Sequence, residues 1–334
     1  MRTRTVSGTE VSLTEIGFGA AVIGNLYRET SDQEAEEAID VAWQAGIRYF
    51  DTAPHYGLGL SERRLGQALK AYPRADVVVS SKVGRLLVPN PDPSGRNHED
   101  FAVPDDLRRV RDYSRDGVLR SIDATLVRTG LDRLDVVYVH DPDDHWQQAV
   151  EEAVPTLDGL RSQGVVRAIG VGMNQSPMLA RFLRETPVDV VMMAGRYTLL
   201  EQDALDGALA AATAEGKSVV AAGVFNSGIL SRPRPRSGAK YNYKEARPEL
   251  LARVDQMADI CERHGTSLPA AAIAFPLAHP NVVNVTLGMR SATEVQQNID
   301  GYHAAVPEGV WSDLRAAGLL RPDAPTGQLE ERLG

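Results

Sequence analysis

Eight short apolar runs rich in β-branched residues alternate with longer amphipathic segments, and this alternation limits the fold of the chain more than any other feature. The runs have the length and composition of buried strands and lie at residues 14–19, 47–51, 77–83, 134–140, 166–172, 188–194, 218–224 and 281–288. Their nearly continuous apolar character is typical of a parallel sheet covered by helices. Eight strand and helix units in about 280 residues predict an α/β fold, a (β/α)8 TIM barrel in place of an open sheet.

The segments between the runs carry helix signals. Residues 31–46 begin at Ser31, which can cap a helix, and residues 114–130 end at Gly130, which suits the left-handed position after one. With 334 residues, 43% of them hydrophobic, the chain can bury one large core. We expect residues 1–322 to form a single barrel domain and residues 323–334 to form a polar C-terminal tail.

Charge and cysteine content argue against several kinds of partner. The net charge of −9 disfavours nucleic acid and anionic membranes. The single cysteine, Cys261, excludes an internal disulfide and fits a reducing compartment. The N-terminus lacks an apolar signal core, and no stretch approaches the roughly 18 apolar residues of a membrane span. We therefore expect a cytoplasmic protein that binds neither nucleic acid nor a membrane; the sequence leaves its oligomeric state open.

Two connections are much longer than the rest. Residues 84–114 follow the third strand and residues 225–249 follow the seventh, and both are rich in proline and glycine. Loops of this length are usually functional or disordered. Both leave the C-terminal ends of strands, the face on which barrel enzymes carry their active sites.

Four polar residues are predicted to meet on that face. Asp51 ends the second strand, Tyr56 lies in the loop after it, Lys82 ends the third strand and His140 ends the fourth. A phenol is a poor acid or base at neutral pH, but a neighbouring cationic amine favours the phenolate and lowers the phenol pKa. An aspartate beside the amine holds it charged, and a histidine can hydrogen-bond the reacting oxygen. The set suits proton transfer coupled to hydride transfer at a carbonyl or carbinol.

These residues lie in motifs of a known family. The strings FDTAPHYG, SSKVG and DVVYVHDPDDH resemble the three motif regions of the aldo-keto reductase superfamily, over about residues 10–320. DYSRDGVLRSI, AIGVGMNQS, AGRYTLLEQ, GVFNSGIL and AAAIAFPLAHP resemble its L-fucose and D-threo-aldose 1-dehydrogenase branch. The resemblance implies that Asp51, Tyr56, Lys82 and His140 form a catalytic tetrad. It also implies NAD(P)-dependent oxidation of a free aldose, such as L-fucose or D-arabinose, at C1 to the lactone.

The resemblance further implies a cofactor site at the strand ends. The loop after the seventh strand would cradle the pyrophosphate, the loop after the eighth would hold the adenosine end, Asn174 would bind the carboxamide and Tyr197 would stack on the nicotinamide. The full expected set is Gly19, Ala20, Asp51, Asn174, Tyr197, Phe225, Asn226, Ser227, Gly228, Leu230, Gly288, Arg290, Glu294 and Asn298.

The sequence departs from the family pattern in ways that bear on the cofactor. Ala194 stands where many relatives have a glutamine, and Gly19-Ala20-Ala21 replaces their usual Gly-Thr pair. Gly288 and Glu294 occupy the positions where NADP-selecting relatives commonly place a lysine and an arginine. Because a glutamate repels the 2′-phosphate, we expect NAD to be preferred to NADP.

Two further motifs suggest a dinucleotide site and a metal site but lack the spacing that each requires. GFGAAVIG, residues 17–24, fails the spacing of a dinucleotide fingerprint, and HDPDDH, residues 140–145, matches no zinc or calcium pattern, so no metal is expected. Residues 232–236, RPRPR, are predicted to be a solvated loop, with a lid near phosphates as the alternative.

The candidates for contact with sugar hydroxyls are His55, Tyr56, His140 and the loop 84–114. The alternatives are an NADPH-dependent aldehyde or ketone reductase, a pyridoxal-type alcohol dehydrogenase, and a nicotinamide-binding regulatory subunit.

Overall fold

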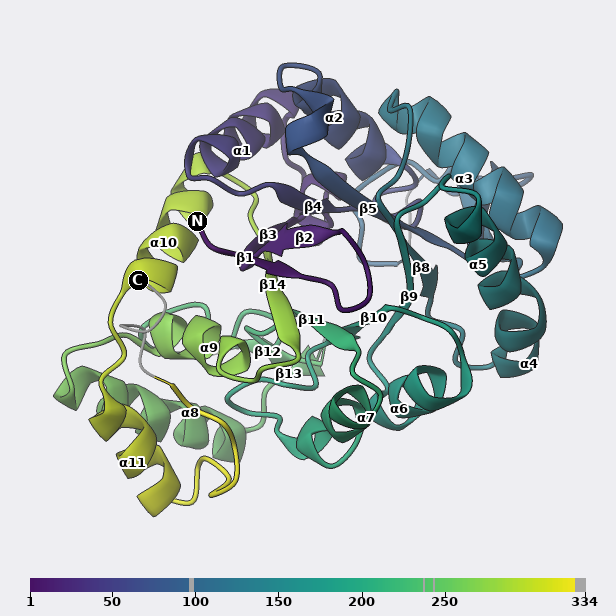
Figure 1. Cartoon of the computed structure of the whole chain (residues 1–334). Coiled ribbons are helices and arrows are strands. Elements are labelled where there is room, and N and C mark those ends of the chain that lie inside the picture. The colour runs from purple at the N-terminus through teal and green to yellow at the C-terminus, as the bar shows by residue number, and fades with distance from the viewer. Residues whose placement is uncertain (96–98, 237, 243, 328–334) are drawn as a thin grey trace.

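Eight parallel strands close into a barrel in the computed structural model, which describes residues 1–95, 99–236, 238–242 and 244–327 (Figure 1). Each predicted run overlaps one barrel strand, so the predicted TIM barrel is confirmed. Around the barrel the strands are β3 (Ile16–Gly19), β4 (Tyr49–Asp51), β5 (Val78–Val83), β8 (Val136–His140), β9 (Ala168–Met173), β10 (Val190–Ala194), β11 (Ser218–Ala222) and β14 (Val282–Gly288).

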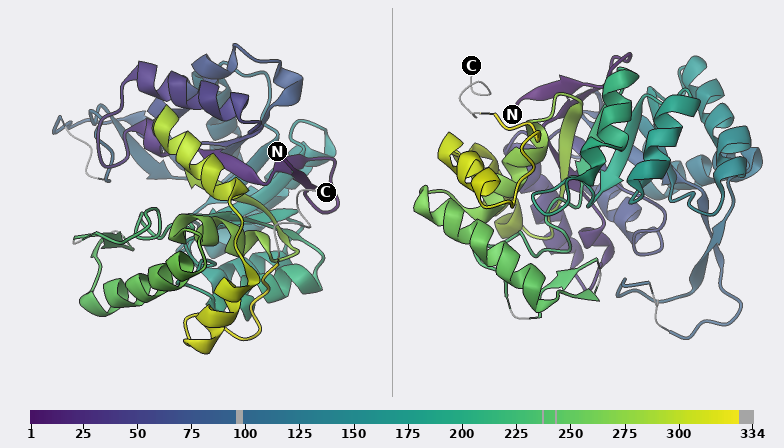
Figure 2. Two further views of the ribbon diagram at one scale, coloured as in Figure 1. Left: turned by 90° about the vertical axis from the view of Figure 1, so that its left-hand side faces the viewer. Right: turned by 90° about the horizontal axis from the view of Figure 1, so that it is seen from below.

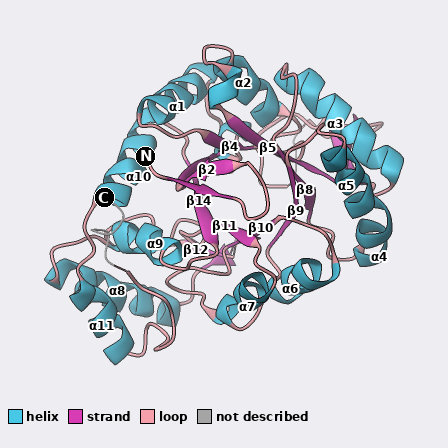
Figure 3. Cartoon of the chain, viewed as in Figure 1, coloured by secondary structure: helices cyan, strands magenta, loops and turns pink. Residues whose placement is uncertain are grey.

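Helices surround the barrel (Figure 3). Ser31 caps α1 in a capping box with Glu34, Ser114 caps α3, and Gly130 ends α3 at a φ of 68°, as the sequence predicted. The helices are α1 (Asp32–Gln44), α2 (Leu60–Leu69), α3 (Arg115–Thr129), α4 (Trp146–Gln148), α5 (Val154–Ser162), α6 (Ser176–Glu185), α7 (Ala208–Ala214), α8 (Pro248–Arg263), α9 (Leu268–Leu277), α10 (Ala292–His303) and α11 (Glu308–Ala316).

A hairpin that the sequence analysis missed covers one end of the barrel. Its strands β1 (Thr3–Thr5) and β2 (Ser12–Thr14) pair antiparallel and cross the barrel in front (Figure 1). Val6, Val11 and Leu13 are fully buried and pack against the apolar residues that fill the barrel interior. Because the hairpin closes this end of the barrel, a ligand can enter only at the opposite end, where the strands have their C-terminal ends; we call this end the mouth.

The two long connections both project at that mouth, on the side away from the N-terminal hairpin (Figure 2, right). The segment 84–114 is not an irregular loop: β6 (Arg85–Pro89) and β7 (Leu107–Arg111) form an antiparallel hairpin. The segment 225–249 contains β12 (Lys240–Tyr241) and β13 (Lys244–Glu245) before α8 begins. Alternating residues of an extended strand point to opposite faces, so the first hairpin can aim side chains into the mouth.

The last described residues pack against the barrel's helices. Ala324 is buried, and Arg315 donates hydrogen bonds to the carbonyl of Ala324 and the hydroxyl of Thr326. The first part of the predicted polar tail is thus fixed to α11, and residues 328–334 of that tail lie outside the described residues. Among the helices of the described residues, none combines the length and hydrophobicity needed to span a membrane.

Candidate active site

The register of two neighbouring strands brings Asp51 and Lys82 together. Asp51 pairs with Ser80 across β4 and β5, and Lys82 lies two residues beyond Ser80 on the same face of its strand. The Lys82 Nζ atom lies 2.6 Å from Asp51 Oδ2 and donates a second hydrogen bond of 3.0 Å to the carbonyl of Thr52. Both side chains are almost fully buried. The two charges therefore compensate each other in a site that water hardly reaches.

A chain of hydroxyl groups from the barrel interior is hydrogen-bonded to Asp51. Ser80 donates a hydrogen bond of 2.7 Å to Asp51 Oδ1, the Ser80 hydroxyl lies 2.9 Å from that of Tyr49, and the Tyr49 hydroxyl lies 3.2 Å from that of Tyr138. Each of these side chains is buried. The network fixes the orientation of the carboxylate that holds Lys82.

Two glycines fix the loop that carries Tyr56. A Cβ atom on Gly57, which has a φ of +61°, would lie 2.2 Å from the carbonyl oxygen of Gly24, and one on Gly24 would lie 2.9 Å from the Tyr56 backbone. No larger residue fits at either position. The GFGAAVIG segment, in which Gly24 lies, thus packs against the catalytic loop, and the rejection of a dinucleotide fingerprint agrees with this structural role.

The phenol of Tyr56 lies above the Lys82 ammonium group. The Nζ atom of Lys82 is 4.7 Å from the centroid of the Tyr56 ring. Burial raises the pKa of Tyr56 above its ordinary value, and Lys82 offsets part of this rise by its charge and by hydrogen bonding. Lys82 thus lowers the pKa of Tyr56 as predicted, but burial has the larger effect. Burial also lowers the pKa of Lys82, but Asp51 and Tyr56 reverse this, so its pKa is raised and the amine stays cationic.

His140 faces Tyr56 across the mouth. The two ring centroids are 6.1 Å apart with the rings nearly perpendicular. Burial and the neighbouring cations, Arg85 first among them, hold the pKa of His140 well below its ordinary value, so the imidazole is neutral. The structure thus brings together all four residues of the predicted tetrad. A neutral imidazole can donate a hydrogen bond to the oxygen of a bound alcohol.

Four further residues line the same mouth: His55, which was expected individually, Arg85 and Phe101 from the expected loop 84–114, and Asp141, which was not expected. Burial together with Arg85 and Arg109 lowers the pKa of His55 to about 2, so this ring is also neutral. Phe101 packs edge-on to His55, with centroids 5.3 Å apart. Arg85 forms an ion pair with Asp141, the residue after His140. The sequence indicated the loop 84–114 as a whole but did not single out Arg85 and Phe101, because it does not specify the path of that segment.

The loop after β11, expected to hold the pyrophosphate, forms a tight turn. Asn226, Ser227 and Gly228 have φ values of 44°, 59° and 93° in succession. Thr198 donates a hydrogen bond of 2.6 Å to the Asn226 side chain, which fixes the turn, whereas Ser227 and Gly228 are exposed and Phe225 is half-buried. The amides of Asn226 and Gly228 donate hydrogen bonds within the turn, to the carbonyls of Gly223 and Phe225.

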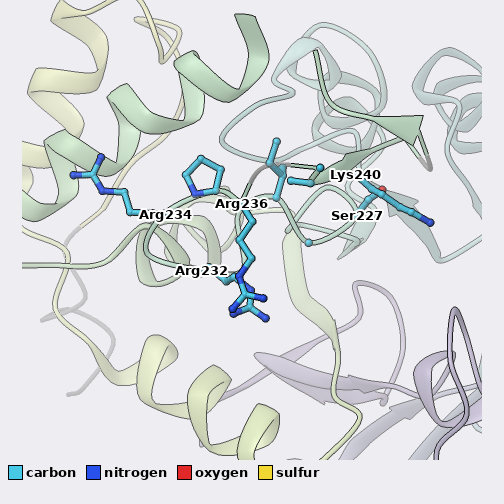
Figure 4. Close-up of a pocket in the computed structure, with 10 residues that line it drawn as sticks. Ser227, Arg232, Arg234, Arg236 and Lys240 are labelled. Carbon is cyan, nitrogen blue, oxygen red and sulfur yellow. The ribbon is translucent and has the colours of Figure 1, made fainter. Parts of the chain in front are cut away.

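The RPRPR segment forms the wall of a pocket of about 200 Å³ beside this turn (Figure 4). Arg234 pairs with Glu262 and Asp259 on α8. Arg232 and Arg236 point away from Arg234 and have no hydrogen-bond or ion-pair partner among the described residues (Figure 4). Arg232 and Arg236 are exposed, as expected of a solvated loop, and they also line this pocket, as the lid alternative requires.

The loop after β14, expected to hold the adenosine end, is tied to the body of the protein. The Arg290 guanidinium donates hydrogen bonds to Thr30 Oγ1 at 2.7 Å and to the carbonyl of Leu26 at 2.7 Å. The Glu294 carboxylate accepts a hydrogen bond of 2.8 Å from the Arg290 amide. Gly288 is exposed, and Asn298 is nearly buried, 3.5 Å from the Gly288 carbonyl. Arg290 is therefore not free to turn toward a ligand.

Three of the expected cofactor contacts need correction. Tyr197 is 1% exposed and packs against Phe275 and His279, so its ring has no face on which a nicotinamide could stack. Ala20 and Leu230 are completely buried. These three residues form part of the walls behind the site.

Two of the other expected contacts, Asn174 and Gly19, lie nearer the surface of the mouth. Asn174 is exposed after β9, and its carbonyl accepts a hydrogen bond of 2.8 Å from Arg196. Gly19 is half-buried at the end of β3, where it pairs with Asp51. Among the described residues, no group of three or more histidine, cysteine, aspartate or glutamate side chains is arranged to hold a metal ion.

A model of the aldo/keto reductase family matches residues 15–318. The chain belongs to this family. It is 46% identical to a D-threo-aldose 1-dehydrogenase from Pseudomonas sp., over 93% of this chain and 95% of the relative. It is 36% identical to a pyridoxal 4-dehydrogenase from Microbacterium luteolum, over 95% and 97%. The holo form of the aldo-keto reductase AKR11C1 from Bacillus halodurans shares the fold, with a TM-score of 0.76, 22% identity and 98% coverage of both chains.

This aldo/keto reductase is an oxidoreductase that acts on CH–OH groups, and its family uses nicotinamide cofactors. The expected branch, the aldose 1-dehydrogenases, agrees with the 46% identical relative.

Replacement of Lys82 by Met should raise the pKa of Tyr56 further, because the offsetting cation is lost. The basic-side dependence of any residual activity should then shift to higher pH, and a pH profile of kcat/KM measures this. Asp51→Asn should weaken the same Lys82–Asp51 ion pair. The losses of activity in the two single variants should therefore not add in the double variant. Ordinary activity with an unchanged pH profile would show that Lys82 is only structural.

Proposed function

We propose that this aldo/keto reductase oxidises the C1 hydroxyl of a free aldose, such as L-fucose or D-arabinose, to the lactone. The observation that carries the proposal is the buried Lys82 and Asp51 pair beneath Tyr56, with His140 across the mouth and a polar rim beside it. The 46% identity to a D-threo-aldose 1-dehydrogenase supports a sugar substrate.

The roles of the residues follow from their positions. Tyr56 accepts the proton of the C1 hydroxyl, Lys82 favours the phenolate, Asp51 orients Lys82, and neutral His140 positions the reacting oxygen. A bound nicotinamide supplies the acceptor for the hydride that leaves C1. Because Lys82 and Asp51 are buried and Lys82 Nζ lies 4.7 Å from the centroid of the Tyr56 ring, the Lys82 charge stabilises the phenolate.

Replacement of Tyr56 by Phe removes the proton acceptor and keeps the ring. The rate of sugar oxidation should fall by at least about 10²-fold, the usual effect of losing a general base. Cofactor binding, measured by quenching of protein fluorescence, should persist. Activity near that of the wild type would contradict the assignment, whereas cofactor binding without turnover of any sugar in the wild type would favour a regulatory subunit.

One observation favours the reverse reaction as a second candidate. Because burial raises the Tyr56 pKa, the phenol is protonated at neutral pH and can donate a proton to a carbonyl oxygen. The same four residues would then serve an NADPH-dependent reductase of aldehydes or ketones. A panel of aldoses, pyridoxal, aldehydes and ketones, assayed with both cofactors in both directions, separates these candidates.

We propose that NAD is preferred to NADP because the loop after β14 offers no free cation to a 2′-phosphate. Glu294 is negative, and Arg290 is engaged by Thr30 and by backbone carbonyls. A single like-charge contact near a surface is worth on the order of 1 kcal/mol, about fivefold in affinity.

Glu294→Arg should therefore shift the ratio of kcat/KM for NAD to that for NADP at least about fivefold toward NADP. The measurement compares both cofactors in the wild type and in the variant. A wild type that favours NADP would contradict the proposal, as would a substitution that leaves the ratio unchanged.

We further propose that Arg232 and Arg236 hold the cofactor pyrophosphate. Replacing both by Gln should weaken binding of NAD and of NADP alike by at least about tenfold, since a hydrogen bond to a charged group contributes about 1.5–3 kcal/mol. Titration of fluorescence quenching measures both affinities. Arg247→Gln, an exposed position on the same excursion and outside the pocket, is the matched control. Weakening for NADP alone would instead place the 2′-phosphate there, and unchanged affinities would exclude the site.

A further inference from the structure

We propose that Asp141 and Arg85 form a hydroxyl-reading pair that binds the hydroxyl group on the carbon next to the one oxidised. The ligand class is a 2-hydroxy sugar, an aldose that carries a hydroxyl at C2, in contrast to a 2-deoxy sugar or a simple alcohol. This inference rests on the proposed aldose oxidation and adds a specificity-determining element to the same site.

The backbone of Asp141 is held in an unusual conformation. Its φ of 43° lies in the left-handed region, which costs a residue with a Cβ atom on the order of 1 kcal/mol. The Tyr113 hydroxyl contacts the carbonyl oxygens of His140 and Asp141 at 2.7 and 2.8 Å, and the Asp141 amide donates to the carbonyl of Gly172. These contacts hold the turn, so the carboxylate is brought back toward His140.

The Asp141 carboxylate lies beside His140 Nε2, the atom proposed to hydrogen-bond the C1 oxygen of the substrate. Asp141 Oδ2 is 3.5 Å from His140 Nε2. Oxygens on adjacent sugar carbons are separated by roughly one hydrogen-bond length, about 3 Å. A substrate whose C1 oxygen is hydrogen-bonded to His140 therefore brings its C2 oxygen within reach of Asp141.

Arg85 supplies the complementary donor. Its guanidinium group pairs with Asp141 and donates a hydrogen bond of 3.2 Å to Nδ1 of neutral His55. The Arg85 side chain is 12% exposed, whereas that of Asp141 is 29% exposed, so the pair is buried on the cation side and open on the carboxylate side. A hydroxyl group can donate to the carboxylate and accept from the guanidinium at once, which no aldehyde or hydrocarbon can do.

The expected consequence is strong discrimination. A site built to hydrogen-bond a substrate hydroxyl rejects an analogue that lacks it by up to about 10⁴-fold, because its buried polar groups lose a partner. The pair would be unnecessary for oxidation of an alcohol without a neighbouring hydroxyl.

The test measures kcat/KM for L-fucose and 2-deoxy-L-fucose, and for D-arabinose and 2-deoxy-D-arabinose. The wild type should prefer each parent sugar by at least about 10²-fold. In Asp141→Ala the preference should collapse to within about tenfold, because only the parent sugar loses an interaction. Asp144→Ala, an exposed residue of the same turn, should keep the wild-type preference.

A second pair of variants guards against misfolding of Asp141→Ala. Arg85→Met should also reduce the preference, while Arg108→Met, an exposed arginine on β7 of the same hairpin, should not. Melting temperatures and cofactor affinities of all variants report whether the fold is kept. Equal losses for parent and deoxy sugars in Asp141→Ala and Arg85→Met would overturn this inference alone. Absence of aldose oxidation in the wild type would overturn the proposed function and the inference with it.

Discussion

The site depends on the ion pair between Lys82 and Asp51. The pair is buried among the ends of β4 and β5, and loss of one partner from such a pair typically costs about 3–5 kcal/mol because the other charge is left alone. The Tyr56 ring above the pair explains why two charges are buried at this place. The Lys82 ammonium group opposes the effect of burial on the pKa of the Tyr56 phenol, by its charge and by hydrogen bonding, so it links the stability of the barrel mouth to the acidity of that phenol.

The barrel positions this pair by ordinary strand geometry. In-register pairing of parallel strands places Asp51, Ser80 and Lys82 on one face, and the N-terminal hairpin closes the other end of the barrel. The close approach of Gly24 and Gly57 then fixes the loop that carries Tyr56. The reacting groups are thus held by rigid elements, which supports precise proton and hydride transfer.

The two long connections, residues 84–114 and 225–249, bring side chains to different parts of the mouth. The hairpin β6 and β7 brings Arg85 to His55 and Asp141, and the segment after β11 brings Arg232 and Arg236 to the pocket that we propose holds the cofactor phosphates. Arg234 anchors the second excursion to α8 through two carboxylates. Neither excursion belongs to the barrel, so each can change its side chains without disturbing the core.

The sequence by itself determined the barrel, its eight strands, and the meeting of Asp51, Tyr56, Lys82 and His140. Hydrophobic periodicity is a local signal, and parallel strands bring their C-terminal ends to one face whatever their loops do. The sequence did not reveal the N-terminal hairpin, the hairpin after β5, or the burial of Tyr197, because each depends on packing between segments far apart in the chain. The net rise of the Tyr56 pKa also required the tertiary structure: residue types name the charges near a phenol, but only the folded protein decides how much water is left around it.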